Sequence, residues 1–471
     1  MIIMEANRQL TLFINGENLH DLPFNLDIDG KRYVCTEVLR LLPTKRLVVK
    51  AHSGDQQLVI KLFAKNKKGE RELVRELLGY QRVEKTGVKT PQLLFSLEEF
   101  SGCCAVAYQY LEQALPVDSG SPLESLEQLS DLLFELTAKL HQSGCYQSDY
   151  HLDNILIVDE KYFLIDLASI KCPQENEQLD KNESLANLAL LIAQFKGLQQ
   201  HYLRQNIQGY YQQRGWPFDQ SEQNRIELAI DKAWLKRKVN YISKCFRSCT
   251  MTRYNKTFSY EYGFRDAFIK ATGADFIDNI EGLMSQGEML KDGNSATVVR
   301  VNYAGIDLVI KRYNIKSFWH FIKRCFRPSR AAVSWRNANL LELIGVATPA
   351  PFGFFEKRFL GLRYTAYFMS AYSPAKELLN IYQQKKPTED ELKQIKKIFS
   401  LLQQYQIAHG DLKAQNLLLD EQGRVLLIDL DAMKEYNDLD SFHAAFAKDK
   451  ARFLRNWQDP KINAIFMALN V

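Results

Sequence analysis

The sequence predicts an α+β fold that occurs twice in tandem, and two observations indicate this class. Short apolar runs typical of strands alternate in blocks with longer helical patterns. The stretch 407–433, IAHGDLKAQNLLLDEQGRVLLIDLDAM, has a counterpart at 145–171, CYQSDYHLDNILIVDEKYFLIDLASIK. Because 471 residues are too many for one ordinary core, we expect two domains, at 1–275 with a helical extension and at 276–471.

The spacing of matched positions supports an internal repeat. The offset grows slowly and never reverses, as expected of two copies that differ by small insertions. It is 250 between Lys61 and Lys311, 258 between Gly87 and Gly345, 262 between Asp149 and Asp411, and 263 between Asp166 and Asp429.

The first half begins with a strand-rich region at about 30–63, where alternating and β-branched runs are separated by turn residues. The run LVIKLF carries Lys61. The pattern that follows, GERELVRELLGYQRVEKTGV, predicts a helix that carries Glu76 and ends at Gly87.

Further along, Ser121 to Glu124 combines an N-cap serine, a first-turn proline and a glutamate, which predicts the start of a helix running to about Gln142. Residues 183–270 look mainly helical. Within them, SLANLALLIAQF predicts a buried helix, and the stretch 234–256 is basic and interleaved with aromatic residues.

In the second half, GEMLKDGNSATVVRV predicts a hairpin whose turn, Lys291 to Thr297, contains Gly293 and other small residues. Such a turn lets backbone amides approach a phosphate group. The strand DLVIKRY places Lys311 where the first half has Lys61. SRAAVSWRNANLLELIGV predicts a helix up to Gly345, and Thr388 to Glu391 is a capping box that opens another helix.

The stretch HGDLKAQN contains Asp411 and, five positions later, Asn416. The apolar runs after it predict a hairpin, which brings Asn416 at its entrance beside Asp429 at its exit. Carboxylate and amide oxygens suit a hard cation such as Mg²⁺. The first half repeats the arrangement with Asp149, Asn154 and Asp166.

Each of these residues alone also fits a purely structural role, such as capping a turn or lying on a solvated face. Their occurrence together and twice favours a site. The pattern resembles the H-x-D-x-x-x-x-N loop and metal-binding strand of the protein-kinase fold, so we expect two tandem protein-kinase-like bilobal domains.

The resemblance implies the following roles. Asp411 and Asp149 would be catalytic and orient the attacking hydroxyl. The metal ligands would be Asn416, Asp429, Asn154 and Asp166. The residues expected to hold ATP are Lys311, Gly293, Lys413 and Lys61, with Glu76 as the helix partner of Lys61.

The chain also resembles the bacterial lipopolysaccharide core kinases of the heptose-kinase and InaA type. The segments that show this resemblance in the second half are KDGNSATVVRV, LVIKRY, SWRNANLLELIGVATPAP, HGDLKAQNLLL, LLIDLDAMK and KARFLRNW. In the first half they are LRLLPTKRLVV, VIKLF, QSDYHLDNIL and NLALLIAQF. This resemblance implies ATP, Mg²⁺ and transfer of phosphate to a sugar of the lipopolysaccharide inner core.

Neither half carries the full kinase pattern. The second has Ser334 where the first has Glu76, while the first lacks a glycine between Leu41 and Ala51 and has Gln147 in place of His409. We favour the second half as the active one. The alternatives are a small-molecule phosphotransferase of the aminoglycoside or choline type, and a pseudokinase scaffold in lipopolysaccharide assembly.

Composition indicates the redox state of the cysteines, the cellular location and the binding partners. The eight cysteines form no disulfide framework, so we expect reduced thiols. No signal peptide and no bilayer-spanning apolar run is evident, which favours a cytoplasmic protein. The basic, aromatic segments 234–256 and 311–330 suggest peripheral binding to an anionic inner-membrane surface. Nothing indicates nucleic-acid binding, and the oligomeric state is not predicted.

Overall fold

The computed structural model describes residues 2–17, 19, 22–117, 125–173, 177–314 and 325–469. The chain forms two compact units, Met1–Trp234 and Leu235–Val471. Each combines helices with antiparallel sheets, which is a mixed helix-and-sheet fold.

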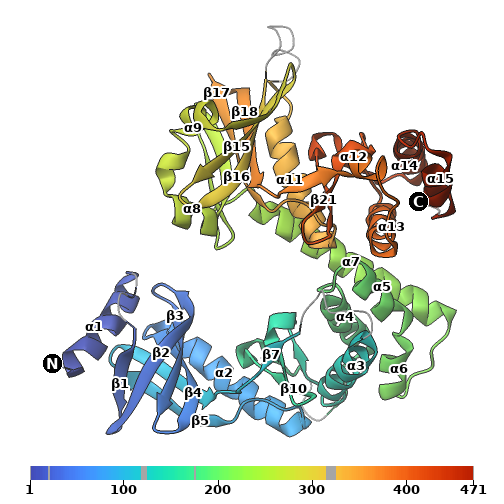
Figure 1. The fold of residues 1–471 in the computed structure, drawn as a ribbon. Helices are drawn as coiled ribbons and strands as arrows, with labels where there is room; N and C mark the ends of the chain where they lie inside the picture. The colour runs from blue at the N-terminus through green and yellow to red at the C-terminus, as the bar shows by residue number, and fades with distance from the viewer. Residues whose placement is uncertain are drawn as a thin grey trace. The chain divides into compact units, whose positions relative to one another are not determined.

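The first unit starts with a six-stranded sheet in the order β1-β2-β3-β4-β6-β5. One face packs on helix α1, whose Leu10 and Phe13 join its buried core, and the other face packs on α2 through Leu73. Figure 1 shows these elements at the blue end of the chain. Their bounds are α1 Ile2–Asn15, β1 Phe24–Ile28, β2 Lys31–Leu42, β3 Arg46–Ser53, β4 Gln56–Ala64, α2 Lys67–Thr86, β5 Leu93–Phe100 and β6 Cys103–Gln109.

The rest of the first unit is mostly helical, with short strand pairs between the helices. These pairs carry the loop residues expected to be functional. The elements are β7 Leu115–Pro116, α3 Leu126–Gln142, β8 Tyr146–Gln147, η2 Leu152–Asn154, β9 Ile155–Val158, β10 Lys161–Leu164, η3 Leu167–Ser169, β11 Ile170–Lys171, α4 Lys181–Ile192, α5 Gly197–Gln205, α6 Gln208–Gln213 and α7 Gln220–Lys244, which continues into the second unit.

The second unit contains a seven-stranded sheet in the order β12-β13-β17-β18-β16-β15-β14. Helices α8 and α9 pack on one face through Phe268, Ile280 and Met284, while Trp335 of α11 packs on the other. The bounds are β12 Thr252–Lys256, β13 Tyr260–Arg265, α8 Asp266–Thr272, η4 Ala274–Phe276, α9 Ile280–Gln286, β14 Glu288–Gly293, β15 Ala296–Tyr303, β16 Ile306–Tyr313, α11 Arg330–Ile344, β17 Pro351–Phe359 and β18 Leu362–Ala371.

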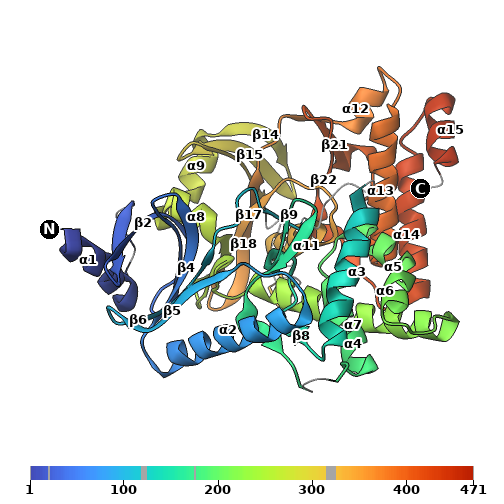
Figure 2. The ribbon, with the colours of Figure 1, turned by 90° about the horizontal axis from the view of Figure 1, so that it is seen from below.

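Its second part is again helical around short strand pairs, as Figure 2 shows at the red end of the chain. The elements are β19 Ala375–Glu377, α12 Leu378–Tyr382, α13 Glu389–Gln404, β20 Ile407–Ala408, η5 Ala414–Asn416, β21 Leu417–Asp420, β22 Val425–Leu427, η6 Leu430–Ala432, β23 Lys434–Glu435, α14 Leu439–Leu454 and α15 Pro460–Ala468.

Local sequence signals explain several helix ends. Gly87 and Gly345 end α2 and α11 in the left-handed conformation, where glycine carries no Cβ penalty. Thr388 and Glu391 form both hydrogen bonds of the expected capping box at the start of α13. The helix start expected at Ser121 to Glu124 lies outside the described residues.

Residues 183–270 are mainly helical, as expected, but they also contain the hairpin of β12 and β13, and β13 pairs with β17. One expectation, the boundary between the two units, differs from the structure. These two strands belong to the sheet of the second unit, so the units divide at 234/235, within α7, and not at 275/276.

Candidate active site

The loop 409–416 of the second unit brings Asp411 and Asn416 together. The Asn416 Nδ2 donates to the Asp411 carbonyl oxygen at 2.7 Å and to its carboxylate Oδ2 at 3.3 Å. The β21–β22 hairpin then returns the chain, and the Ile428 amide donates to the Asn416 carbonyl at 2.9 Å. Asp429, in the left-handed conformation with φ of 66°, therefore follows directly beside Asn416.

Lys311 on β16 reaches this cluster. Its Nζ lies 2.5 Å from Asp429 Oδ1, with the two side chains 18% and 32% exposed. Burial alone would raise the pKa of the Asp429 carboxyl, but the charge and hydrogen bond of Lys311, together with His409 and Arg330, outweigh burial and lower that pKa. Asp429 is therefore ionised at neutral pH, as a cation ligand must be.

Two further cations flank the Asp411 carboxylate. Lys413 Nζ lies 3.2 Å from its Oδ2, and Arg452 Nε on α14 lies 3.7 Å from its Oδ1. The Asp411 side chain is 39% exposed, so an incoming hydroxyl group can reach it.

Asp449 on α14, which the sequence analysis did not identify, holds the backbone of the loop in place. Its carboxylate is 1% exposed and accepts hydrogen bonds from the amides of Gly410, at 2.9 Å, and Leu412, at 3.3 Å. Arg452 adds a bond to the Gly410 carbonyl at 2.8 Å. The segment KARFLRNW, which starts at residue 450, was the only sequence signal near this contact.

His409 is fully buried and contacts the Ile428 carbonyl oxygen through Nε2 at 2.9 Å. Burial is the main cause of its lowered pKa, so the imidazole is neutral and acts as a structural group.

In the second unit, β14 and β15 form the hairpin expected to lie over the nucleotide phosphates, here called the cover hairpin. Gly293 ends β14 and pairs with Ala296 across the turn of this hairpin. Ser334, which stands where the first unit has Glu76, is bonded to the Tyr313 hydroxyl at 2.8 Å. Lys311 pairs with Asp429 instead.

In the first unit, Lys61 Nζ lies 2.5 Å from Glu76 Oε1. Glu76 is completely buried and also accepts from the Tyr108 hydroxyl at 3.2 Å and the Ala168 amide at 3.1 Å. The buried carboxylate is thus fully hydrogen-bonded, and it joins β4, α2 and the segment after Asp166.

The loop of the first unit repeats the geometry of the second. Asn154 Nδ2 donates to the Asp149 carbonyl at 2.9 Å, and Asp166 is left-handed with φ of 58°. Gln147 donates through Nε2 to the Ile165 carbonyl at 3.0 Å. It therefore contacts the carbonyl that corresponds to the one His409 contacts.

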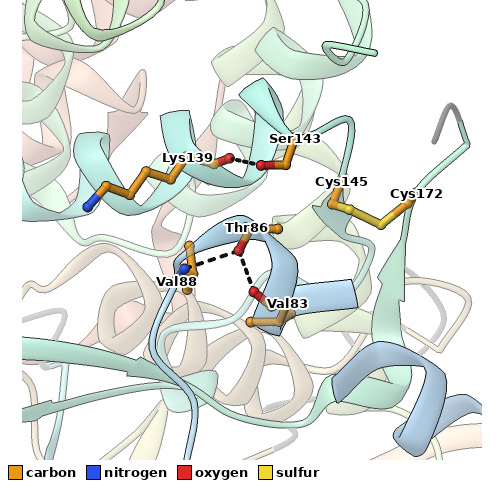
Figure 3. The surroundings of a disulfide bond; sticks show 7 residues. All are labelled: Val83, Thr86, Val88, Lys139, Ser143, Cys145 and Cys172. Carbon is orange, nitrogen blue, oxygen red and sulfur yellow. Dashed lines mark hydrogen bonds between the residues drawn. A yellow bond between two sulfur atoms is a disulfide. The ribbon is translucent and has the colours of Figure 1, made fainter. Parts of the chain in front are cut away.

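One expectation about the cysteines is wrong. Cys145, just after α3, and Cys172, just after β11, form a disulfide (Figure 3). They extend the β8–β11 pairing, in which Lys171 lies opposite Tyr146. The sequence could not show this proximity, because the pairing depends on the tertiary fold.

The donor set is compatible with a magnesium ion only in part. Among the residues that the structure describes, no group of three His, Cys, Asp or Glu side chains is arranged to hold a metal. Asn416 uses its amide nitrogen toward Asp411, which leaves its Oδ1 available beside the Asp429 carboxylate. Two protein oxygens suit Mg²⁺, which takes its other ligands from water and phosphate groups.

Comparison with known proteins confirms the family resemblance for the second unit. Residues 283–444 match the Lipopolysaccharide kinase (Kdo/WaaP) family. This range contains Lys311, Asp411 and Asp429. No curated protein matches the sequence of the chain.

Two solved structures resemble the chain. One is WaaP in complex with acyl carrier protein, at 16% identity, with a TM-score of 0.31, covering 43% of this chain and 87% of that one. The other is vaccinia related kinase 3, at 16% identity, with a TM-score of 0.28, covering 51% of this chain and 81% of that one. In the described part of the chain, no helix has the length and apolarity to cross a bilayer.

Proposed function

We propose that the second unit is a kinase that transfers the terminal phosphoryl group of ATP to a sugar hydroxyl of the lipopolysaccharide inner core. The observation that carries this proposal is the cluster of Lys311, Asp411, Asn416 and Asp429 within the range that matches the lipopolysaccharide kinase family. The family match supports a phosphotransferase, and the cluster supplies the groups that phosphoryl transfer needs.

Asp411 takes the proton of the acceptor hydroxyl. Its carboxylate is accessible, and the Asn416 amide fixes its orientation. Lys413, beside the same carboxylate, lies where the negative charge of a transferred phosphoryl group would be stabilised.

Asn416 and Asp429 are the residues that would hold Mg²⁺, which neutralises phosphate charge when it is bound. Lys311 would exchange its contact with Asp429 for the nucleotide phosphates. Gly293 in the cover hairpin allows the backbone to approach the same phosphates.

We further propose that the two units are tandem copies of one protein-kinase-like bilobal fold. In both, a left-handed aspartate follows a hairpin, and an asparagine side chain donates to the carbonyl of an aspartate five residues before it. In both, a strand lysine lies within 4.0 Å of the left-handed aspartate.

The site would work at the cytosolic face of the inner membrane, with the protein bound peripherally. On α7, Leu235 and Val239 are 54% and 58% exposed, and Lys236 is exposed beside them. Half of the second basic segment, residues 315–324 of 311–330, lies outside the described residues. We expect salt-sensitive sedimentation with anionic vesicles, and no sedimentation at low salt would contradict this.

A transfer assay with several acceptors tests the function. We expect label from the terminal phosphate of ATP to enter core lipopolysaccharide when Mg²⁺ is present. Transfer to an aminoglycoside or choline, but not to lipopolysaccharide, would support the small-molecule reading. Thermal stabilisation by ATP without transfer to any acceptor would support a scaffold, a reading that the absence of a glutamate at Ser334 favours.

A further inference from the structure

The first unit contains a cavity of about 430 Å³, which lies outside the range that matches the kinase family. Its size falls within the range of small-molecule sites, about 300–1,000 Å³. Its wall combines apolar side chains, among them Val48, Val59 and Leu156, with the cations Arg40, Arg46 and Lys61 and the carboxylates Glu76, Asp153 and Asp166. A ligand with an apolar part and with an anionic part that meets the cations matches this lining.

Arg46 is the unusual member of this wall. Its Nη1 lies 3.5 Å from Asp166 Oδ1, and its side chain is only 13% exposed. Its Nε is buried and has no hydrogen-bond partner. A mostly buried guanidinium with an unused Nε donor therefore lies beside the carboxylate that corresponds to Asp429 of the second unit.

Sheet register shows that this arginine distinguishes the two units. Val48 lies opposite Lys61 in the first unit, and Val298 lies opposite Lys311 in the second. Two residues earlier on the same strand, the first unit has Arg46 and the second has Ala296. The second unit therefore has no cation at this strand position, where Ala296 packs in the core cluster with Tyr313 and Trp335.

The turn between β2 and β3, next to the lining residues Arg40 and Arg46, has two backbone amides that already have acceptors. The Thr44 amide donates to the Phe13 carbonyl of α1 at 3.1 Å, and the Lys45 amide donates to the Leu42 carbonyl at 3.0 Å. The turn also has no glycine. Any phosphate bound there is therefore neutralised by side chains, and a guanidinium suits this because it can bind phosphate oxygens in pairs.

We propose that the first unit is a second nucleotide-binding site, in which Arg46 and Lys61 hold the phosphates of a nucleoside triphosphate without a divalent metal. Lys61 keeps its 2.5 Å pair with Glu76, and Asp166 faces both cations, at 3.5 and 4.0 Å. This pairing takes the place that a metal would need. The inference rests on the proposed common fold of the two units, but it concerns binding and not transfer.

The test uses the full chain, in which Lys311→Met and Asp429→Asn disable the site of the second unit. ATP binding is measured by isothermal titration calorimetry in EDTA. We expect one equivalent to bind, and we expect Arg46→Ala or Lys61→Met to weaken it about tenfold or more, since each removes a charge-assisted hydrogen bond. Arg46→Lys keeps the charge and should weaken it less.

Arg32→Ala is the matched control, because Arg32 lies on the same sheet in an exposed pair with Asp27. No binding in EDTA, or binding that Arg46→Ala and Lys61→Met leave unchanged, would overturn the proposal. If inorganic triphosphate binds as tightly as ATP, the claim that the site recognises the nucleoside is wrong. If Arg46→Ala does not fold, Arg46→Lys and Lys61→Met decide the question.

This outcome is independent of the proposed function. Phosphate transfer that depends on Asp411, without ATP binding to the first unit in EDTA, would refute only the nucleotide site proposed in the first unit. Binding without transfer would refute only the kinase activity.

Discussion

Asp449 holds the Gly410 amide at 2.9 Å, which connects helix α14 to the loop that carries Asp411. Since the carboxylate is buried and also accepts from Leu412, it acts as an anchor for the loop backbone. The position of the loop, and hence of the Asp411 carboxylate, depends on this side chain together with Arg452 and Asn456.

We predict that Asp449→Ala destabilises the second unit by about 1–3 kcal/mol, because two amides lose their partner. Phosphate transfer should fall about tenfold or more, since a small displacement of a catalytic group is costly. Urea unfolding and the transfer assay measure the two effects. Asp440→Asn, at an exposed position of the same helix, is the control and should change neither greatly.

Gly410 and Gly423 form a natural pair for a second prediction. Both are left-handed, with φ of 81° and 73°. A Cβ on Gly410 would lie 2.8 Å from the Ala432 carbonyl oxygen, whereas a Cβ on Gly423 would meet nothing within 4 Å.

Gly423→Ala should therefore cost only the left-handed backbone penalty of about 1–2 kcal/mol. Gly410→Ala should cost more than Gly423→Ala and should also lower phosphate transfer, because the loop must shift. Chemical denaturation of both variants checks the difference. Equal destabilisation by the two would show that the close approach to Ala432 has no energetic effect.

Gln147 and His409 make equivalent contacts, to the carbonyls of Ile165 and Ile428. We predict that His409→Gln keeps most transfer activity, while His409→Ala loses about tenfold or more because the loop is no longer fixed. If His409→Gln is as inactive as His409→Ala, the imidazole has a chemical role that the structure does not show.

The buried His141 makes the stability of the first unit depend on pH. It contacts the Tyr210 hydroxyl at 2.7 Å and Asn187 Oδ1 at 3.1 Å, and burial lowers its pKa to about 3. Because the folded pKa lies below the unfolded value, its contribution is complete above about pH 6.5 and is lost as pH falls towards 3.

The slope should reach about 1.4 kcal/mol for each pH unit. His141→Gln should flatten this acid dependence of the unfolding free energy, while His201→Gln, at an exposed position, should not. The same slope in His141→Gln as in the parent chain would mean that other groups control acid unfolding.

The features of the fold that could be predicted from the sequence are mostly set by residues close together in the chain. Glycines that end helices and the capping box at Thr388 act over a few residues, so the pattern alone is sufficient. The hairpin between Asn416 and Asp429 was predictable for the same reason, because its two apolar runs flank a short turn.

Other features depend on distant parts of the chain. Asp449 reads as an ordinary charged helix residue until the fold buries it under the loop. Arg46 reads as a solvated strand residue, although it reaches Asp166 far along the chain. The Cys145–Cys172 pairing and the membership of β12 in the second sheet likewise depend on tertiary contacts that no local pattern specifies.

The most direct test of the central claim compares Asp411→Asn with Asp149→Asn in transfer of labelled terminal phosphate from ATP to core lipopolysaccharide. The pair is matched, since both residues occupy the same place in the two loops. We predict that Asp411→Asn abolishes transfer and that Asp149→Asn leaves it largely intact. Full transfer by Asp411→Asn would contradict the account.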